Sequence, residues 1–540
     1  MSNALLDIQQ LDIAFPPQPP LVRGLDLRIQ AGQSLALVGE SGSGKSLTSL
    51  AVMGLLPTSA QVKPEAVWFN GQNVHRLTRS GWQDFRGKQA AMVFQEPMTS
   101  LNPVMRCGKQ VAEHLSGTTA EKRAQVLALF KEVELPHPER IFKAYPHALS
   151  GGQKQRVMLA MAVAANPALL IADEPTTALD VTVQKRVLQL IRRMQTNRNM
   201  AVLFITHDLA VVREVADHIA VLFRGDLVES GPTAHVLDRP EHAYTRALIA
   251  CRPPTTGKPF PLPTVSSVMA GHKGSQDTLP PFVPSGAPVL EIHGLRKTYG
   301  KGEAAVKALD GVDLHVHAGE VLGLVGESGC GKSTVSKCIS GLVHPDAGTL
   351  TWKGQPIDLR KLRARQAFSK EVQMVFQDPF SSLTPNQTVG QALTEVLHIH
   401  SPGLSKTERQ ARIADMLDEV GLPQEAADRY PHSFSGGQRQ RVVVARALLT
   451  DPELIICDES VSALDVSVQA QILNLLNTLK IQRNLAFLFI SHDLNVVRYM
   501  SDRIAVMRRG LVVETGDADQ VCSHPQHAYT KSLMDAIPKG

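Results

Sequence analysis

Residues 39–46 read GESGSGKS and residues 326–333 read GESGCGKS, so one eight-residue motif occurs twice with a single residue changed. The pattern G-x-x-x-x-G-K-[ST] is typical of a phosphate-binding loop (P-loop): backbone N–H groups surround the phosphates, Lys reaches the terminal phosphates and Ser reaches Mg²⁺. An apolar run precedes each copy, SLALVG or EVLGLVG, and a helical pattern follows it. This strand, loop, helix order favours phosphate binding over the alternative, a glycine-rich surface turn.

The composition is that of a globular protein with at least two domains. The chain has 540 residues, of which 43% are hydrophobic and 20% charged, and its net charge of +5 is the difference between 56 basic and 51 acidic residues. A chain of this length exceeds the size of a single core. The near balance of charge argues against a dedicated nucleic-acid binder. We find no signal-peptide pattern and no long apolar run, so we expect that the chain does not itself enter a membrane.

The chain contains an internal repeat. The P-loop lysines, Lys45 and Lys332, lie 332 − 45 = 287 residues apart, and Glu174 and Glu459 lie 459 − 174 = 285 apart. Between the copies, residues 253–288 are rich in Pro and Gly and lack periodicity, so we interpret them as a linker. The sequence therefore predicts one domain at 1–252 and a second at 289–540.

Each unit has the pattern of an α/β domain. Short alternating strands open both units (LLDIQQLDIAF; VLEIHGLRKTY), and apolar runs such as ALLIADE and MAVLFITHD then alternate with helical segments. Continuous apolar runs of strand length are typical of a buried, mostly parallel sheet. We expect a helical insert at roughly 97–165 and 379–450.

Two acidic residues end a buried strand in each unit. Asp173 and Glu174 follow LLIA, and Asp458 and Glu459 follow LIIC. Alone, such a pair is as well explained by a solvated turn or by a helix N-terminus. After a P-loop, the pair predicts a carboxylate on the metal side and a Glu that aligns or deprotonates water.

A histidine ends another apolar strand, 33 residues after each of these glutamates. His207 closes FITH and His492 closes FISH. A single histidine of this kind is usually a hydrogen-bonded structural residue. Because the two occupy matching strand ends beside the same site, we expect contact with the γ-phosphate.

A second glycine-rich motif precedes a helix in each unit, LSGGQ at 149–153 and FSGGQ at 434–438. Ser followed by paired Gly at a helix start binds anions through free N–H groups and the positive end of the helix dipole. A simple N-cap is the alternative. One γ-phosphate hardly needs two such elements from the same side, so two phosphate-binding elements in one domain pose a puzzle.

The ordered motifs resemble those of ATP-binding cassettes (ABC ATPases). GESGSGKS, FQEP, LSGGQ, LLIADEP, TALD and ITHD are followed by GESGCGKS, FQDP, FSGGQ, LIICDES, SALD and ISHD. The resemblance implies two P-loop NTPase domains, each with a mostly parallel core sheet, an antiparallel β subdomain and a helical subdomain. It also implies that the signature loop of one cassette completes the ATP site of the other. The puzzle of two phosphate-binding elements is thereby resolved.

The resemblance assigns roles to matching positions. It implies catalytic roles for Glu174, His207, Glu459 and His492, and Mg²⁺ contact for Ser46, Gln95, Asp173, Ser333, Gln377 and Asp458. The first unit would contact nucleotide through Phe15, Gly39, Gly42, Ser43, Gly44, Lys45, Ser46, Gln95, Ser150, Gly151, Gly152, Gln153 and Asp180. The second would do so through Tyr299, Gly326, Gly329, Cys330, Gly331, Lys332, Ser333, Gln377, Ser435, Gly436, Gly437, Gln438 and Asp465. For Phe15 and Tyr299, core packing is the alternative to stacking on adenine.

Further motifs are similar to those of oligopeptide, dipeptide and nickel importers: EPMTSLNP, DPFSSLTP, HAYTRAL and HAYTKSL. The resemblance implies a peptide importer ATPase on the cytoplasmic face of a bacterial inner membrane. Its partners would be two integral-membrane permease subunits and, through them, an extracytoplasmic substrate-binding protein, with no nucleic acid. Nickel or small-solute import is an alternative, as is a tandem cassette acting on ribosomes or DNA. Such ribosome or DNA proteins usually join their halves by a long charged helical arm or carry inserted coiled coils or zinc modules, whereas here the linker is rich in Pro and Gly and the inserts are short.

The cysteines predict neither disulfides nor a metal centre. The six, at 107, 251, 330, 338, 457 and 522, form no C-x-x-C pair, as expected for reduced thiols in the cytosol. Some members of the group carry an iron–sulfur cluster after the HAYT segment, but only Cys251 and Cys522 lie there, so we expect none. Cys330 replaces the serine of the first P-loop. Its place near a lysine and a helix N-terminus suggests a lowered pKa and, as a minor hypothesis, redox inhibition.

The second unit departs from the usual motif at one further position. Ser460 follows Glu459 where a Pro is usual. Because both units keep their Lys, Glu and His, we expect both sites to hydrolyse ATP.

Overall fold

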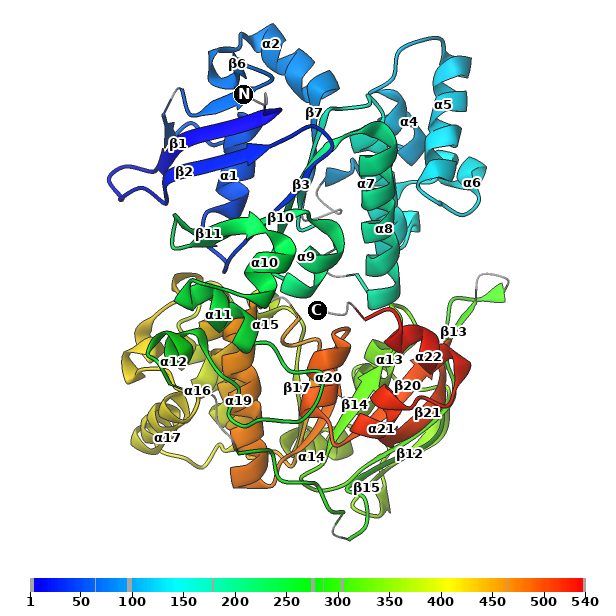
Figure 1. Ribbon diagram of the computed structural model, residues 1–540. Helices are drawn as coiled ribbons and strands as arrows, with labels where there is room; N and C mark the ends of the chain where they lie inside the picture. Colours follow the sequence, from blue (N-terminus) through cyan, green and yellow to red (C-terminus); the bar gives the residue numbers. More distant parts are fainter. Residues whose placement is uncertain are drawn as a thin grey trace.

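The computed structural model describes residues 4–63, 65–94, 100–176, 179–272, 277–284, 286–302, 305–462 and 464–537. Figure 1 shows two halves of the same architecture, with the N-terminal half above the C-terminal one. Among the described residues, no helix is both long and apolar enough to cross a bilayer.

A six-stranded sheet forms the centre of each half. Its strand order is β11-β10-β3-β9-β8-β7 in the first half and β17-β18-β19-β14-β20-β21 in the second. Neighbours are parallel, except that β11 and β21 run antiparallel to β10 and β20. The first sheet comprises β3 (Ser34–Val38), β7 (Ala90–Val93), β8 (Leu169–Asp173), β9 (Ala201–Thr206), β10 (His218–Phe223) and β11 (Asp226–Pro232). The second comprises β14 (Val321–Val325), β17 (Val372–Val375), β18 (Leu454–Asp458), β19 (Ala486–Ile490), β20 (Arg503–Arg508) and β21 (Leu511–Asp517).

A smaller antiparallel sheet packs on one face of each central sheet. The first contains β1 (Leu6–Ala14), β2 (Val22–Ile29), β4 (Gln61–Val62), β5 (Val67–Phe69) and β6 (Gln72–Asn73). The second contains β12 (Leu290–Tyr299), β13 (Val306–Val316), β15 (Ala347–Trp352) and β16 (Gln355–Pro356). The expected antiparallel subdomains are confirmed.

Helices form the insert that the sequence predicts in each half. The first insert contains α4 (Cys107–Ala112), α5 (Thr119–Glu132), α6 (Pro138–Lys143) and α7 (Gly151–Val163). The second contains α15 (Pro379–Ser382), α16 (Val389–His400), α17 (Lys406–Glu419) and α18 (Gly436–Leu448). The other helices of the first half are α1 (Lys45–Val52), α2 (Arg79–Asp84), α8 (Val181–Arg198), α9 (Leu209–Val215), α10 (Thr233–Asp238) and α11 (Ala243–Ala250). Those of the second are α13 (Lys332–Ile339), α14 (Leu362–Glu371), α19 (Val466–Arg483), α20 (Leu494–Met500), α21 (Ala518–Ser523) and α22 (Ala528–Met534).

Strand β3 shows why these runs are apolar throughout. All five of its residues are buried. Leu35 and Leu37 pack into the core shared with the antiparallel sheet, whereas Ala36 and Val38 face the helix-side core. A strand covered on both faces requires apolar residues at every position, so the strand ends, where the polar motifs begin, mark the site.

The linker packs on the second half. The sequence predicts an irregular segment there, and in its described residues the structure has a short helix, α12 (Val265–Met269). Leu262 N–H donates to Asn474 Oδ1 at 2.7 Å, and Asn474 Nδ2 donates to Leu262 O at 2.9 Å. Tyr499 OH donates to Pro259 O at 2.8 Å. The linker is therefore held along α19 and α20.

Candidate functional site

Each P-loop has a backbone that only glycine can follow. Gly44 and Gly331 adopt φ of 104° and 116°, a left-handed region that other residues rarely enter. A Cβ on Gly39 would lie 2.2 Å from Leu222 O, and one on Gly326 would lie 2.2 Å from Met507 O. The glycines thus let the loop pass close to the end of the neighbouring strand.

Each P-loop lysine donates to backbone carbonyls of its own loop. Lys45 Nζ donates to Gly39 O at 2.7 Å and to Glu40 O at 2.8 Å. In the second half, Lys332 Nζ donates to the equivalent Gly326 O at 2.7 Å and Glu327 O at 3.0 Å. Burial lowers the pKa of Lys45, although nearby carboxylates oppose the shift. The buried Ser43 hydroxyl has no partner among the described residues. A buried cation beside backbone N–H groups and an unsatisfied hydroxyl fit a bound phosphate.

A serine and an aspartate meet beside each P-loop. Ser46 Oγ lies 3.2 Å from Asp173 Oδ1, and Ser333 Oγ lies 3.3 Å from Asp458 Oδ1. Burial raises the pKa of Asp173 to about 6 and also raises that of Asp458. The described residues include no group of three or more His, Cys, Asp or Glu suited to a metal. One hydroxyl and one carboxylate fit Mg²⁺, which takes its remaining ligands from phosphate and water.

The glutamate and histidine of each half lie together. His207 Nδ1 is 3.1 Å from Glu174 Oε1. Burial lowers the pKa of His207, but the hydrogen bond and charge of Glu174 outweigh it and leave the pKa raised. In the second half His492 Nδ1 is 3.7 Å from Glu459 Oε2, and His492 lowers the pKa of that carboxyl. An ionised Glu beside an imidazole suits a group that holds water.

Backbone geometry fixes both glutamates after their strands. Glu174 and Glu459 have φ of 47° and 53°, a conformation that costs a non-glycine residue about 1 kcal/mol or more. Their N–H groups donate to the neighbouring strand, Glu174 to Ile205 O at 2.9 Å and Glu459 to Ile490 O at 2.8 Å. The fold therefore holds the carboxylates at the sheet edge despite the strain.

In the second half, the side-chain amide of Gln377 contacts Glu459 directly. Gln377 Nε2 donates to Glu459 Oε2 at 2.8 Å. Gln377 therefore lies at the carboxylate that we expect to hold water. Its counterpart in the first half, Gln95, lies outside the described residues, so its predicted Mg²⁺ contact stays a prediction.

The signature serines cap helices. Ser150 accepts from Gln153 N and Ser435 accepts from Gln438 N, and each glutamine side chain accepts from the N–H of its serine. A Cβ on Gly152 would lie 2.5 Å from Val183, and one on Gly437 would lie 2.2 Å from Val468. The inner glycine of each pair thus allows close helix packing. A Cβ on Gly151 or Gly436 would meet no atom closer than 3.8 Å among the described residues, so these two positions leave room for a ligand.

An aspartate of the first half contacts the P-loop of the second half. Ser328 N–H in the second P-loop donates to Asp180 Oδ2 at 3.3 Å, and Thr182 Oγ1 donates to Glu327 Oε1 at 3.1 Å. At the first P-loop, two residues of the second half act on Glu40. Burial raises the pKa of Glu40, a hydrogen bond with Ser467 opposes this shift, and the negative charge of Asp465 adds to it. Among the described residues, hydrogen bonds reach the opposite P-loop from Asp180 and its neighbours, whereas Ser150 and Ser435 bond to their own helices.

The two candidate adenine-stacking aromatics have different surroundings. Phe15 packs partly buried against the core of the first half. Tyr299 is 42% exposed, with Lys297 Nζ 5.8 Å from its ring centroid. Tyr299 is the more exposed of the two, and both stacking roles stay predictions.

The thiol of Cys330 is less acidic than the sequence suggested. It is buried and its Sγ lies 3.8 Å from Lys332 Nζ. Burial raises its pKa, and the lysine offsets only part of this shift. Since the thiolate is the reactive form, the expectation of a lowered pKa is wrong and the redox hypothesis loses its basis.

Two tyrosines at the P-loops were missed by sequence reasoning. Tyr244 OH accepts from Glu40 N–H at 3.1 Å, and Tyr529 OH accepts from Glu327 N–H at 3.0 Å. Both belong to the repeated HAYT segments, which the sequence marks without giving them a role. Their repetition at matching positions was the available signal.

Comparison with known proteins identifies the family of this chain. The family model described as ABC transporter matches residues 22–177 and 309–462, and the oligopeptide/dipeptide transporter C-terminal region matches 228–268 and 513–540. The glutathione import ATP-binding protein GsiA of Salmonella typhimurium is 43% identical over 566 residues, covering 99% of this chain and 90% of the relative. The peptidoglycan transport ATP-binding protein YejF of Agrobacterium fabrum is 43% identical over 548 residues, covering 99% and 96%.

A solved structure of cbiO1 from Clostridium perfringens covers 44% of this chain and 91% of its own, with 26% identity and a TM-score of 0.40. The two family matches and the identity over the whole chain are the stronger result. They show that this chain belongs to the ABC transporter family, as an ATP-hydrolysing subunit with two cassettes and the C-terminal region of oligopeptide/dipeptide transporters.

Proposed function

We propose that the chain is the motor of a peptide importer in which two composite ATP sites form between residues 1–252 and 289–540. The contact of Asp180 and Thr182 with Ser328 and Glu327 carries this proposal. Groups of one half there reach the P-loop of the other, so closing the halves joins both to one nucleotide. The nearby Ser435 and Ser150 loops would then cover the nucleotides on Lys45 and Lys332.

Each site has the groups that ATP hydrolysis requires. Lys45 and Lys332 would bind the β- and γ-phosphates. Mg²⁺, when bound, supplies charge neutralisation between those phosphates, and the Ser46–Asp173 and Ser333–Asp458 pairs would hold it. Glu174 and Glu459 would accept hydrogen bonds from the attacking water. His207 and His492 would orient these carboxylates and donate to the γ-phosphate.

The two relatives and the C-terminal region support a peptide as the imported solute. One relative is named for glutathione import and the other for peptidoglycan transport, and the C-terminal match is to oligopeptide/dipeptide transporters. Two integral-membrane permeases and a binding protein outside the membrane would complete the system, with this chain attached peripherally to the cytoplasmic face of the inner membrane.

A reconstituted system tests this function. The tagged chain would be purified from its own membranes, permeases identified by mass spectrometry, and the complex placed in liposomes with the binding protein. We expect small peptides to stimulate ATP hydrolysis and to accumulate in the liposomes. Stimulation by nickel but not peptides would contradict the solute class. Stimulation of the isolated chain by ribosomes or DNA, without permeases, would contradict the import role.

A further inference from the structure

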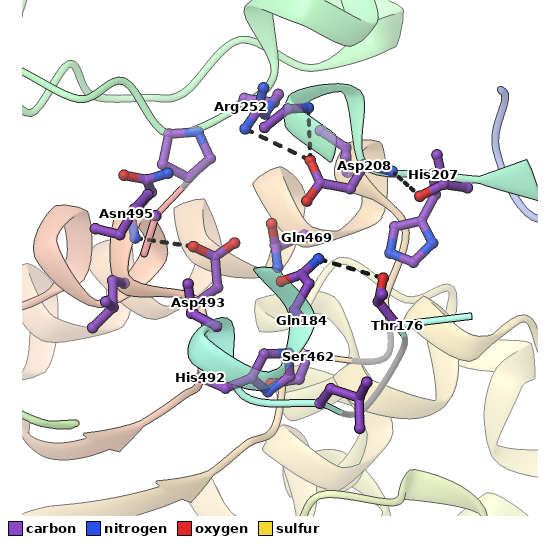
Figure 2. A pocket seen from close by; sticks show the side chains of 18 of the residues that line it. Thr176, Gln184, His207, Asp208, Arg252, Ser462, Gln469, His492, Asp493 and Asn495 are labelled. Carbon is purple, nitrogen blue, oxygen red and sulfur yellow. Dashed lines mark hydrogen bonds and ion pairs between the residues drawn. The ribbon is translucent and has the colours of Figure 1, made fainter. Parts of the chain in front are cut away.

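A cavity of 110 Å³ lies where the two halves meet, and equivalent residues of both halves line it. Figure 2 shows His207 and Asp208 of the first half with His492 and Asp493 of the second around this space. Further matched pairs in the lining are Leu179 with Leu464, Val181 with Val466, and Gln184 with Gln469. The cavity therefore lies near the axis that relates the halves.

Two carboxylates face this cavity, one from each half. Asp208 caps α9 by accepting from Ala210 N at 2.9 Å, and Asp493 caps α20 by accepting from Asn495 N at 2.9 Å. Each follows directly after a site histidine. Burial raises the pKa of Asp493, and the negative charge of Asp208 raises it further. Both carboxylates line the same small cavity, so their negative charges repel across the interface.

An arginine of the first half lies beside Asp208 and lines the same cavity. Arg252 Nη2 is 3.7 Å from Asp208 Oδ1, with 25% of the arginine side chain exposed. Its charge also opposes the pKa shift of Asp493. In the other half, the equivalent position, 252 + 285 = 537, is Ile537, which lines the same cavity. Among the described residues of the lining, Arg252 thus has an apolar counterpart, and the cation beside the two carboxylates comes from the first half.

The linker fixes the place of this arginine. Arg252 follows α11, and two residues later Arg498 Nη1 of α20 donates to Pro254 O at 3.1 Å. α20 is the helix that Asp493 caps. The chain before Arg252 thus belongs to a helix of the first half, and the chain after it is hydrogen-bonded to a helix of the second half.

We propose that Arg252 is a positioning residue of the ATPase cycle: its guanidinium offsets the repulsion between Asp208 and Asp493 and so stabilises the closed arrangement of the two halves. The ion pair that the structure gives it is with Asp208, and it belongs to neither P-loop. Its loss therefore weakens ATP-driven closure, which raises KM, while the chemical step in the closed state stays close to normal and kcat is retained.

The test compares Arg252→Gln, which removes the charge but keeps a polar stem, with Arg252→Lys, which keeps the charge. Hydrolysis by the isolated full chain is measured against ATP concentration. We expect Arg252→Gln to raise KM about 5- to 10-fold with kcat within about 2-fold, and Arg252→Lys to stay within about 2-fold of wild type. The imported solute does not enter this assay, so its outcome is independent of the peptide proposal.

A second substitution separates charge from packing. In the Arg252→Gln background, Asp493→Asn removes one of the repelling charges and still supplies a good helix cap. We expect it to return KM to within about 2-fold of wild type. Calorimetry would verify folding of each variant. An unchanged KM in Arg252→Gln, or a raised KM that Asp493→Asn does not relieve, would overturn the proposal.

Discussion

At the scale of single residues, each P-loop is supported by a tyrosine far away in the sequence. Tyr244 lies 204 residues after Glu40, and Tyr529 lies 202 residues after Glu327. Each tyrosine hydroxyl accepts a hydrogen bond from the N–H of that glutamate. Tyr244 is fully buried, and its ring lies 4.2 Å from that of Phe223. The hydroxyl therefore has one fixed position, and it orients the first peptide of the loop.

We predict that Tyr244→Phe and Tyr529→Phe each weaken nucleotide binding at the P-loop that the tyrosine contacts. Removing the acceptor leaves a partly buried N–H unpaired, which costs about 1 kcal/mol, equivalent to about 5-fold in affinity. Isothermal titration with ATP and Mg²⁺ would resolve the two sites.

Tyr499→Phe is a matched control for this substitution. Its side chain is equally buried and donates to the linker at Pro259 O rather than to a P-loop. We expect its nucleotide affinity to equal that of wild type. Equal losses in all three variants would show that the effect is a general loss of stability.

Sequence motifs predict residues whose chemistry is local. Lys45 lies within a contiguous loop pattern, and Glu174 follows a recognisable strand, so both were placed correctly at the sheet edge. Tyr244 and Arg252 act on groups in distant segments, and no local pattern reports that contact. The direction of the Cys330 pKa shift was missed because burial depends on tertiary packing.

At the scale of elements, an aspartate before β10 joins this strand to β3. Asp217 Oδ2 accepts from Ser34 N at 3.0 Å and Ser34 Oγ at 2.7 Å, and Arg192 Nη2 donates to Oδ1 at 3.0 Å. The equivalent Asp502 accepts from Val321 N and, at 2.6 and 2.8 Å, from Lys480 Nζ. The two aspartates thus connect the same pair of strands in each half, but one is paired with an arginine and the other with a lysine.

We predict that Asp502→Asn destabilises its sheet more than Asp217→Asn does. The Lys480–Asp502 pair is only 12% exposed on each side, so breaking it costs about 3 kcal/mol. Asp217 is 37% exposed and solvent-screened, so its loss costs about 1 kcal/mol. Hydrogen exchange of β14 and β3 would measure the two effects separately. Equal effects would contradict the role of burial.

The contribution of Asp217 has a defined pH dependence. Burial would raise its pKa, but hydrogen bonds from Ser34 and Arg192 outweigh burial and leave it lowered. A lowered folded-state pKa stabilises the fold above the unfolded value of about 3.9 and loses this effect as pH falls through the folded value. The difference between wild type and Asp217→Asn in β3 exchange should therefore shrink below about pH 4.

The linker shows the limit of composition as a predictor. Its Pro and Gly content predicts a segment without regular structure, and most of it has none. The contacts of Leu262 with Asn474 and of Pro259 with Tyr499 could not be predicted, because they depend on how α19 and α20 lie. The boundaries at 252 and 289 stay predictions.

At the scale of the whole molecule, nucleotide binding and the contact between halves are linked. Asp180 lies against the second P-loop, and Lys185 Nζ donates to Asp535 O of the other half at 2.6 Å. The contact between the halves therefore includes a residue of a proposed ATP site, and we expect nucleotide binding at that site to change this contact.

We predict that Glu174→Gln with Glu459→Gln abolishes ATP turnover and leaves ATP bound with the halves closed. The amide cannot accept a proton from water, and a loss of about 100-fold or more in kcat is expected for removing a general base. Radiolabelled ATP retention and spin-label distances between the halves would measure both effects.

The single variants are the control, since each keeps one intact site. Residual turnover in only one of them would show that the sites are unequal. Full activity in the double variant would remove both carboxylates from the proposed role.

The anchored linker also limits how far the two cassettes can separate. Because residues 254–262 are fastened to α19 and α20, the free tether after α11 is only a few residues long. A tether this short keeps the local concentration of each cassette around the other on the order of millimolar or above. Cassettes that separate stay joined by this tether, so their reassociation needs no diffusional search and does not depend on how many copies the cell contains.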